Sequence, residues 1–413
     1  MNTTSGVNTL SAFVLASLLM AVASHSCADE AAIRLPAGFK LTKFADSKTK
    51  NGSLLSGARF MAFDANGNLF VSAASGDKVL MLPDANKDGI ADEVVIVAQD
   101  LNAPQGLAFV GNDLLVANQD GVVKLRQVNG VWAKPQPFIS RLPTGGHTLK
   151  TIKLGPDGYL YINVGSSCNV CAENDPLRAT ILRYTLDGKP AGALVTMGRH
   201  QQSAIWAKGL RNSQGFAWHP ATGDMFATNN GADNRSDVKG GKVNDEIPPE
   251  HLNKIEGGKH YGWPHCWGVP GTKNLVEDPS FKAEPDFSKP PHAPAITFTS
   301  HTTPIGITFL DKTNWPAEYK TDAIVALHGS WNRQQPAGYQ LVRVKFSNQQ
   351  PVAVEDFASG WLVSPKETGW FKRHQVYGRP VDVAVGYDGA LYVSDDKADS
   401  IYRISYGIEG ELK

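Results

Sequence analysis

Residues 152–163 read Ile-Lys-Leu-Gly-Pro-Asp-Gly-Tyr-Leu-Tyr-Ile-Asn, and this stretch decides the fold. Two short runs rich in large apolar residues flank the sequence Gly-Pro-Asp-Gly. Alternation of apolar and other residues is typical of a β-strand, and Gly, Pro and Asp supply the backbone conformations of tight turns. The stretch therefore predicts a β-hairpin.

Related strand–turn–strand units recur along the chain, beginning near Met61, Gly106, Gly215, Gly306 and Val381, the unit at Gly306 being looser. Counting the unit at Ile152, the successive spacings are about 45, 46, 63, 91 and 75 residues. The shorter spacings match a four-stranded propeller blade, and the longer ones match a blade with inserted loops. A single unit of this kind cannot bury both faces of its sheet, so the units must stack or close into a ring. We predict an all-β protein, a six-bladed β-propeller with long inserted loops.

No linker interrupts this series, so residues 29–413 are expected to form a single domain. Ahead of it, the apolar run Leu10–Ala23 and the small residues up to Ala28 predict a signal peptide over residues 1–28, although no Lys or Arg precedes the run. The run is short for a membrane span, so we expect no stable membrane insertion. The alternatives are an uncleaved anchor and lipid attachment at Cys27. The favoured interpretation is a periplasmic or secreted protein.

The composition limits the possible partners. The chain has 413 residues, 42% of them hydrophobic, with 40 Lys plus Arg against 40 Asp plus Glu. Residues 1–28 carry none of these charges, so their removal leaves the balance unchanged. Without a net field, an electrostatic nucleic-acid binder is not expected.

Three cysteines follow the predicted cleavage site: Cys168, Cys171 and Cys266. A haem attachment site needs His after the second Cys of the pair, but residue 172 is Ala. A zinc site needs a second ligand pair at suitable spacing, which the chain lacks. In an oxidising compartment, Cys168 and Cys171 are expected to close a small disulfide loop and to leave Cys266 unpaired.

Polar residues stand directly ahead of five of the hairpins, where elements entering equivalent propeller strands converge at one end of the channel. They are Arg59, Gln105, His147, Arg211 with Asn212, and Arg379. Each of these residues, taken alone, is more simply interpreted as a solvated surface side chain. Three arginines, a histidine and two amides together, however, suit a polyanionic ligand. The stretch His328-Gly-Ser-Trp-Asn-Arg333 adds a donor, a stacking plane and a cation, and His301 is a weaker candidate for the same rim.

Two stretches are rich in oxygen ligands. Asp84, Asn86, Asp88 and Asp92 occupy positions 1, 3, 5 and 9 of a calcium-loop pattern with Gly89 at position 6, but Val95 replaces the expected Glu at position 12. Two interpretations of this stretch stay open: a structural calcium site, and an Asp/Asn-rich turn without metal. The second stretch, residues 229–233, lies behind the second strand of the fourth hairpin and is too polar for a core.

Long inserts, residues 233–300 and 311–338, hold many of the Trp, Pro and His residues. Loops of such length are usually functional, the alternative being that they cap the ring or mediate dimer contacts.

Three motifs carry a family resemblance. They are Gly-Leu-Arg-Asn-Ser-Gln-Gly at 209–215, Asp-Glu at 245–246 followed by Tyr-Gly-Trp-Pro at 261–264, and His-Gly-Ser-Trp-Asn-Arg at 328–333. With them, essentially the whole chain after the signal peptide resembles the soluble glucose and sorbosone dehydrogenases that depend on pyrroloquinoline quinone (PQQ). The resemblance implies a six-bladed propeller that holds PQQ over its channel mouth beside Ca²⁺. It also implies a sugar or alcohol substrate and an external electron acceptor.

The resemblance also implies roles for single residues. His147 would be the general base for the substrate hydroxyl. Arg211 and Asn212 would contact the quinone oxygens and stabilise the charge that grows there. Gln105 would orient substrate or quinone, and Arg59 and Arg379 would pair with cofactor carboxylates. The backbone oxygens of Gly231 and Ala232 would hold the calcium ion.

Glucose-oxidising members place a Lys near the quinone carboxylates, where this chain has residues 328–333, so it is nearer the sorbosone or pyranose type. Two other classes remain open. One is a calcium-dependent lactonase or hydrolase on the same fold, which needs acidic and amide side chains from several blades. The other is a non-catalytic binding propeller.

Overall fold

The computed structural model describes residues 33–193, 203–282, 289–362 and 376–407. The predicted signal peptide lies outside these residues. The described part is built from β-strands, with short 3-10 turns at Gly52–Leu55, Ala74–Gly76 and Ala317–Tyr319. None of its helical segments has the length and apolarity that a membrane-spanning helix requires.

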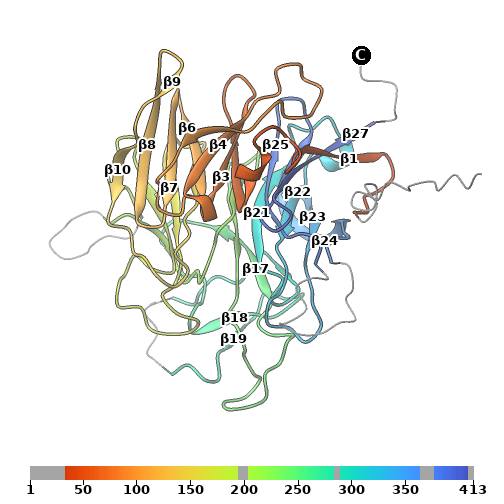
Figure 1. Cartoon of the computed structure of the whole chain (residues 1–413). Helices are drawn as coiled ribbons and strands as arrows, with labels where there is room; N and C mark the ends of the chain where they lie inside the picture. The colour runs from red at the N-terminus through yellow and green to blue at the C-terminus, as the bar shows by residue number, and fades with distance from the viewer. Residues whose placement is uncertain (1–32, 194–202, 283–288, 363–375, 408–413) are drawn as a thin grey trace, which may run out of the picture. The chain divides into compact units, whose positions relative to one another are not determined.

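Six antiparallel sheets follow one another along the chain (Figure 1). The first contains β2 (Ala58–Phe63), β3 (Leu69–Ala73), β4 (Lys78–Leu82) and β5 (Val95–Ala98). The second contains β6 (Gly106–Val110), β7 (Asp113–Asn118), β8 (Gly121–Val128) and β10 (Gln136–Ser140), with β9 (Val131–Trp132) paired to β8. The third contains β11 (Ile152–Leu154), β12 (Leu160–Val164), β13 (Thr180–Tyr184) and β14 (Ile205–Lys208).

The later sheets have the same plan. The fourth contains β15 (Phe216–Trp218), β16 (Met225–Asn229), β17 (Glu250–Ile255) and β20 (Ile296–Phe298). The fifth contains β21 (Pro304–Phe309), β22 (Ala323–Leu327), β23 (Gln340–Ser347) and β24 (Gln350–Ala358). The sixth contains β25 (Pro380–Val385), β26 (Leu391–Asp395), β27 (Ser400–Tyr406) and the N-terminal strand β1 (Phe39–Ala45). The prediction of an all-β, six-bladed propeller is confirmed, and each predicted hairpin forms the two inner strands of one blade.

The ring closes because β1 joins the last sheet, with Phe39 opposite Tyr406 and Leu41 opposite Ile404. The sixth blade therefore combines strands from both ends of the domain and joins the chain's first blade to its last. Closure of this kind removes the free edges that an open sheet would expose.

The hydrophobic core is divided among the interfaces between blades. On β3, Leu69 and Val71 pack against Ala390 and Tyr392 of the sixth blade. Phe70, between them, packs on the other face, in a cluster with residues of the second blade. Successive strand residues point to opposite faces of a sheet, so the period-two pattern supplies one face to each neighbouring blade.

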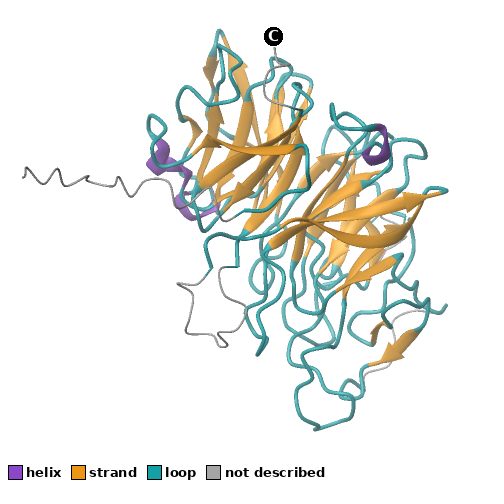
Figure 2. Ribbon diagram, turned by 90° about the vertical axis from the view of Figure 1, so that its right-hand side faces the viewer, coloured by secondary structure: helices purple, strands orange, loops and turns teal. Residues whose placement is uncertain are grey.

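The long inserts are more ordered than the sequence suggested. Residues 233–300 contain β17 and β20, which complete the fourth blade, and a separate hairpin of β18 (Cys266–Gly268) and β19 (Leu275–Glu277). Figures 1 and 2 both show this hairpin among long loops at one end of the sheets.

Candidate functional site

The residues ahead of the inner strands meet across blades. Arg59, the second residue of β2, donates from Nε to Oε1 of Gln105 at 2.9 Å and from Nη2 to Oε1 of Gln214 at 3.3 Å. Gln105 precedes β6 and Gln214 precedes β15, so three blades contribute to one cluster. Gln214 was not among the predicted site residues, although it stands in the same 209–215 motif as Arg211.

Asp396 joins this cluster to the fifth and sixth blades. Its Oδ2 lies 2.5 Å from Nη1 of Arg59, and its Oδ1 lies 2.9 Å from Nε2 of His328. Burial alone would raise the pKa of Asp396, but His328, Arg59 and Arg379 outweigh it and hold the pKa well below its usual range. An ionised carboxylate only accepts hydrogen bonds, so Nε2 of His328 carries the proton. Asp396 had no signal in the sequence beyond following a strand.

Arg379 lies against the start of the predicted 328–333 stretch. It donates from Nε to the carbonyl of His328 at 3.1 Å and from Nη2 to that of Gly329 at 2.9 Å. Its Nη1 donates to no described residue. Burial, helped by Arg379, lowers the pKa of His328 to about 4 against the opposing effect of Asp396, so the imidazole is neutral near pH 7.

His147 lies across the site against the segment after β12. Its Nδ1 lies 2.9 Å from Oγ of Ser166 and 3.2 Å from the Ser166 carbonyl. The Ser166 hydroxyl donates its single proton to the carbonyl of Cys168 at 2.6 Å, so its oxygen can only accept from His147. Nδ1 therefore carries the imidazole proton, and Nε2 keeps its lone pair.

The pKa of His147 is lowered to about 4, first by burial and then by the charge of Arg211. The pKa of this histidine thus lies well below the ordinary value near 6.5. At neutral pH the ring is an uncharged proton acceptor.

Arg211 is 4% exposed and ion-paired: its Nη2 lies 2.7 Å from Oδ2 of Asp233. Nε and Nη2 also contact the carbonyl and the Oδ1 of Asn169, at 3.1 and 2.9 Å. The backbone of the adjacent Asn212 is held by Asn229 and Asn230. Its side-chain amide has no hydrogen-bond partner among the described residues. Asp233 and Asn169 were not among the predicted site residues.

The loop that carries Gly231 and Ala232 lies over a buried carboxyl group. The Gly231 amide donates to Oε2 of Glu250 at 2.5 Å, and the Thr303 amide lies 3.4 Å from Oε1. Burial raises the pKa of Glu250 to about 7, against the lowering effects of the Gly231 amide and Arg211. Glu250 is the first residue of β17 and gave no sequence signal.

Two other predicted rim residues have different surroundings. His301 is buried, and its Nε2 has no hydrogen-bond partner within the described part of the chain. Arg333 donates from Nη1 to the carbonyls of Asp245 and Ser300, at 2.6 and 3.2 Å, and from Nη2 to Glu246 at 2.6 Å. Its guanidinium thus ties insert loops together. The neighbouring Asn332 reaches Oδ1 of Asp233 at 3.2 Å and so joins the site.

The Asp84 loop lies elsewhere, between β4 and β5, at the end of the first sheet opposite to Arg59. Its side-chain oxygens accept from the loop's own amides: Asp84 from Asp88 and Gly89, at 3.1 and 3.0 Å, and Asp92 from Ala85 at 2.8 Å. These hydrogen bonds are those of an Asx-type turn. A calcium ion there remains only a prediction.

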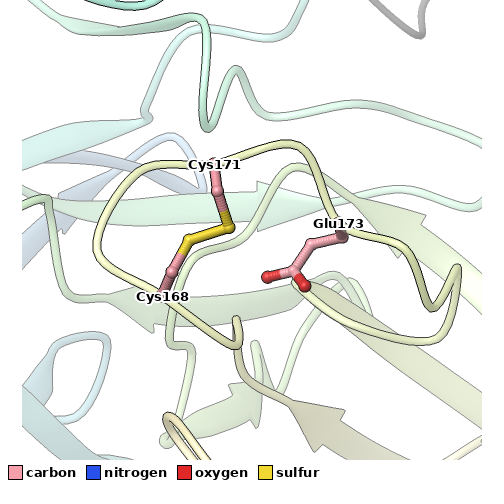
Figure 3. Close-up of side chains that lie close together, drawn as sticks. All are labelled: Cys168, Cys171 and Glu173. Atoms are coloured by element: carbon pink, nitrogen blue, oxygen red, sulfur yellow. A yellow bond between two sulfur atoms is a disulfide. The ribbon is translucent and has the colours of Figure 1, made fainter.

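Cys168 and Cys171 form the expected disulfide, with an S–S distance of 1.96 Å, and Cys266 is a free thiol whose pKa burial raises to about 11. With Glu173, the two sulfurs are the only group of three or more His, Cys, Asp or Glu residues within the described ranges whose ligand atoms gather within 4.8 Å (Figure 3). Disulfide sulfurs are not thiolates and do not bind metal in this state. Glu173 instead accepts from the amide and hydroxyl of Ser167, at 2.6 and 2.7 Å.

Comparison with known proteins matches this chain to a family model described as TrAA12-like over residues 37–407. An uncharacterized protein of Borreliella burgdorferi is 28% identical over 416 residues, which cover 95% of this chain and 97% of that protein. A pyrroloquinoline quinone-dependent pyranose dehydrogenase of Coprinopsis cinerea is 25% identical over 280 residues, 59% of this chain and 37% of the dehydrogenase.

Solved structures share the fold. The calcium structure of the Trichoderma reesei family AA12 enzyme has a TM-score of 0.73 at 20% identity and covers 91% of this chain and 97% of its own. The holo form of the pyranose dehydrogenase PQQ domain of Coprinopsis cinerea has a TM-score of 0.70 at 21% identity, with 90% and 97% covered. At these identities the likeness shows the fold alone.

Proposed function

We propose that this chain, which belongs to the TrAA12-like family, is a PQQ-dependent oxidoreductase that oxidises a hydroxyl or aldehyde group of a sugar or related compound. The observation that carries the proposal is the neutral His147, whose unprotonated Nε2 shares a site with Arg211. A proton acceptor beside a buried cation is what oxidation by hydride transfer requires. The quinone itself is carried over from the pyranose dehydrogenase relative.

The donor set fits a polyanionic quinone. Arg59, Arg211 and Arg379 bring three guanidinium groups to one end of the channel, and each carries five N–H donors. Nη1 of Arg379 has no described partner. Arg59 and Arg379 would pair with cofactor carboxylates, and Arg211 with Asn212 would contact the quinone oxygens.

The loop at residues 229–233 fits a hard cation. Gly231 and Ala232 would offer backbone oxygens to Ca²⁺, which prefers carbonyl and carboxylate ligands. Glu250 lies directly beneath and accepts from the Gly231 amide, so it holds the loop and would supply negative charge near a bound ion. Asp233 adds a second carboxylate next to the same loop.

The chemistry can be assigned to this chain's residues with one addition: when bound, the quinone would accept the hydride that leaves the substrate carbon. Nε2 of His147 would take the proton of the substrate hydroxyl at the same time. Ser166 holds the ring in the tautomer that makes this possible. Arg211 would stabilise the negative charge that develops opposite the base. The two electrons would then pass to an external acceptor.

The carboxylates argue against the hydrolase alternative. Asp396 pairs with Arg59 at 2.5 Å and Asp233 pairs with Arg211 at 2.7 Å, so each of these carboxylates already has a cationic partner. A non-catalytic propeller would not require His147 to be held as a free base.

The decisive experiment reconstitutes the purified protein with Ca²⁺ and PQQ and follows dye reduction over a panel of pyranoses, sorbosone, glucose and simple alcohols. We expect turnover with a sugar that needs both additions and that His147→Ala lacks. Lactone hydrolysis without PQQ would favour the hydrolase, and PQQ binding without turnover on any substrate would favour the binding propeller.

Export is part of the same proposal: the signal peptide predicted over residues 1–28 would place the protein in the periplasm or outside the cell. The Cys168–Cys171 disulfide supports an oxidising compartment. Cell fractionation, with mass determination of the N-terminus, tests both export and cleavage.

A further inference from the structure

We propose that the loop closed by the Cys168–Cys171 disulfide positions the site: its Asn169 fixes Arg211 and Asp233, and its Cys168 carbonyl fixes His147 through Ser166. The catalytic meaning of this proposal rests on the proposed function. The structural claim, that one small cross-linked loop sets the geometry of residues from other segments, can be tested without any cofactor.

Asn169 makes contacts with both members of an ion pair. Its Oδ1 accepts from Nη2 of Arg211 at 2.9 Å and from the amide of Asp233 at 2.7 Å. Its Nδ2 donates to the Asp233 carbonyl at 2.9 Å. One amide side chain therefore holds the guanidinium and the backbone of its carboxylate partner in a single arrangement.

The backbone of Asn169 strengthens the same arrangement. Its carbonyl accepts from Nε of Arg211 at 3.1 Å and from the indole Nε1 of Trp263 at 3.0 Å. Trp263 is 8% exposed and belongs to the insert after β17. The loop is thus anchored on a buried ring, and Arg211 donates two hydrogen bonds to one residue.

The first residue of the loop acts on the proposed base. The Cys168 carbonyl accepts the hydroxyl proton of Ser166 at 2.6 Å, which obliges Ser166 to accept from Nδ1 of His147. If that carbonyl turned away, the hydroxyl could donate to Nδ1, and only the longer contact with the Ser166 carbonyl, at 3.2 Å, would still favour a proton on Nδ1. The opposite tautomer, with a proton on Nε2, would then gain population. That tautomer cannot accept a substrate proton at Nε2.

The disulfide is what keeps so short a segment in place. Residues 168–171 belong to no strand, and regular backbone pairing therefore does not restrict them. A covalent link between Cys168 and Cys171 removes conformations that an open loop would sample. Glu173 fixes the flanking backbone by accepting from Ser167. Asn169, Ser166 and the disulfide are positioning groups and have no chemical role of their own.

The first test compares Asn169→Ala with Val170→Ala, a truncation of the next residue in the same loop. Hydrogen–deuterium exchange of the segment containing the Asp233 amide is the cofactor-free measurement, because that amide donates to Asn169. We expect exchange there to rise roughly 10-fold in Asn169→Ala, about the value of one hydrogen bond, and to stay unchanged in Val170→Ala. PQQ affinity, measured by titration, should fall in the same variant by at least that factor.

The second test addresses the disulfide and the tautomer. The double change Cys168→Ala/Cys171→Ala should increase Asp233 exchange as Asn169→Ala does, whereas Cys266→Ala, which removes only the free thiol, should not. Ser166→Ala should lower kcat several-fold and alter the pH profile while leaving PQQ affinity near the original value. Asn169→Asp, which keeps the acceptor but loses the donor, should lie between Asn169→Ala and the unchanged protein.

The outcomes separate the two proposals. Unchanged Asp233 exchange in both Asn169→Ala and the double cysteine variant overturns the positioning role, whatever the protein does with PQQ. If the unchanged protein binds no PQQ but the exchange results hold, the proposed function fails and the positioning role stands.

Discussion

Two loops in this propeller are both rich in Asp and Asn but have different surroundings. Residues 84–92 and residues 229–233 both carry Asp and Asn side chains that could bind calcium. In the first loop, the side chains turn back onto the loop's own amides, and most of the loop is exposed. In the second, a buried carboxyl group holds the loop from beneath, and an arginine pairs with its last residue.

The difference shows that the identity of potential ligands does not by itself mark a metal site. An exposed Asx turn satisfies its own oxygens locally, so a cation offers it little. A loop held over a buried carboxyl group carries a charge that burial makes costly, and a bound cation would relieve that cost. We therefore expect function at residues 229–233 and at most a small contribution to stability at residues 84–92.

The largest expected effect is that of removing calcium. Excess chelator should reduce PQQ binding and dye reduction to background, and added Ca²⁺ should restore both. The measurement is titration of PQQ in chelator against titration in Ca²⁺. Equal PQQ affinity in the two conditions would remove the distinction between the loops.

His147→Ala should come next. Loss of a positioned base typically costs about 10²–10⁴-fold, so turnover should fall by roughly that factor while PQQ affinity stays near the original value. Arg211→Ala is the comparison, because it should weaken both binding and turnover. Near-normal turnover in His147→Ala would mean that this histidine only lines the rim.

Glu250→Gln tests the support beneath the second loop. Changes behind metal ligands typically cost about 10–100-fold in metal affinity, and this variant keeps size and one acceptor while removing the charge. We therefore expect calcium affinity to decrease by about 10–100-fold, as measured from the Ca²⁺ concentration that restores PQQ binding. Asp88→Asn, the matched change in the first loop, should leave it unaltered, and an equal effect of both variants would contradict the comparison.

Stability should depend on pH through buried histidines. Burial lowers the pKa of His147, His251 and His328 to about 4, so between pH 6.5 and 4 the unfolded chain binds protons that the folded one does not. The contribution of these histidines is complete above about pH 6.5 and should be lost as the pH drops through this window. Glu250 and Asp395, whose pKa values are raised to about 7 and about 6, act in the opposite sense, as does Asp382, whose pKa burial also raises. Burial lowers the pKa values of His219 and His301 as well, so five histidines oppose three carboxyls. Thermal unfolding at pH 7.5 and 5.0 measures the net change, and a higher midpoint at pH 5.0 would contradict it.

The smallest effect should arise at the first loop. Asp88→Asn should change the free energy of unfolding by no more than about 1 kcal/mol, the scale of a single exposed hydrogen bond. A thermal midpoint that drops steeply in chelator for the unchanged protein, but not for Asp88→Asn, would instead establish a structural calcium ion there.

The blades could be predicted because their information is local. A period-two apolar pattern on either side of a Gly/Asn/Asp turn specifies a hairpin within about a dozen residues, as at 152–163. Repetition of that hairpin then implies a closed ring, since one unit cannot bury both faces. The same logic placed Arg59, Gln105, His147, Arg211 and Arg379 toward one end of the channel. The Cys168–Cys171 disulfide was also a short-range inference.

The partners of those residues were decided only by the tertiary structure. Arg59 pairs with Asp396 from 337 positions away, and Arg211 is held by Asn169 from 42 positions away. No local pattern distinguishes Asp396, Asn169 or Glu250 from ordinary surface residues, because their surroundings come from other blades. Burial likewise lowers the pKa of His147 and raises that of Glu250, and burial depends on packing between segments that are remote in sequence. The chain by itself thus determined the blades and which end of the ring carries the cations, while closure of the ring decided which charges face one another.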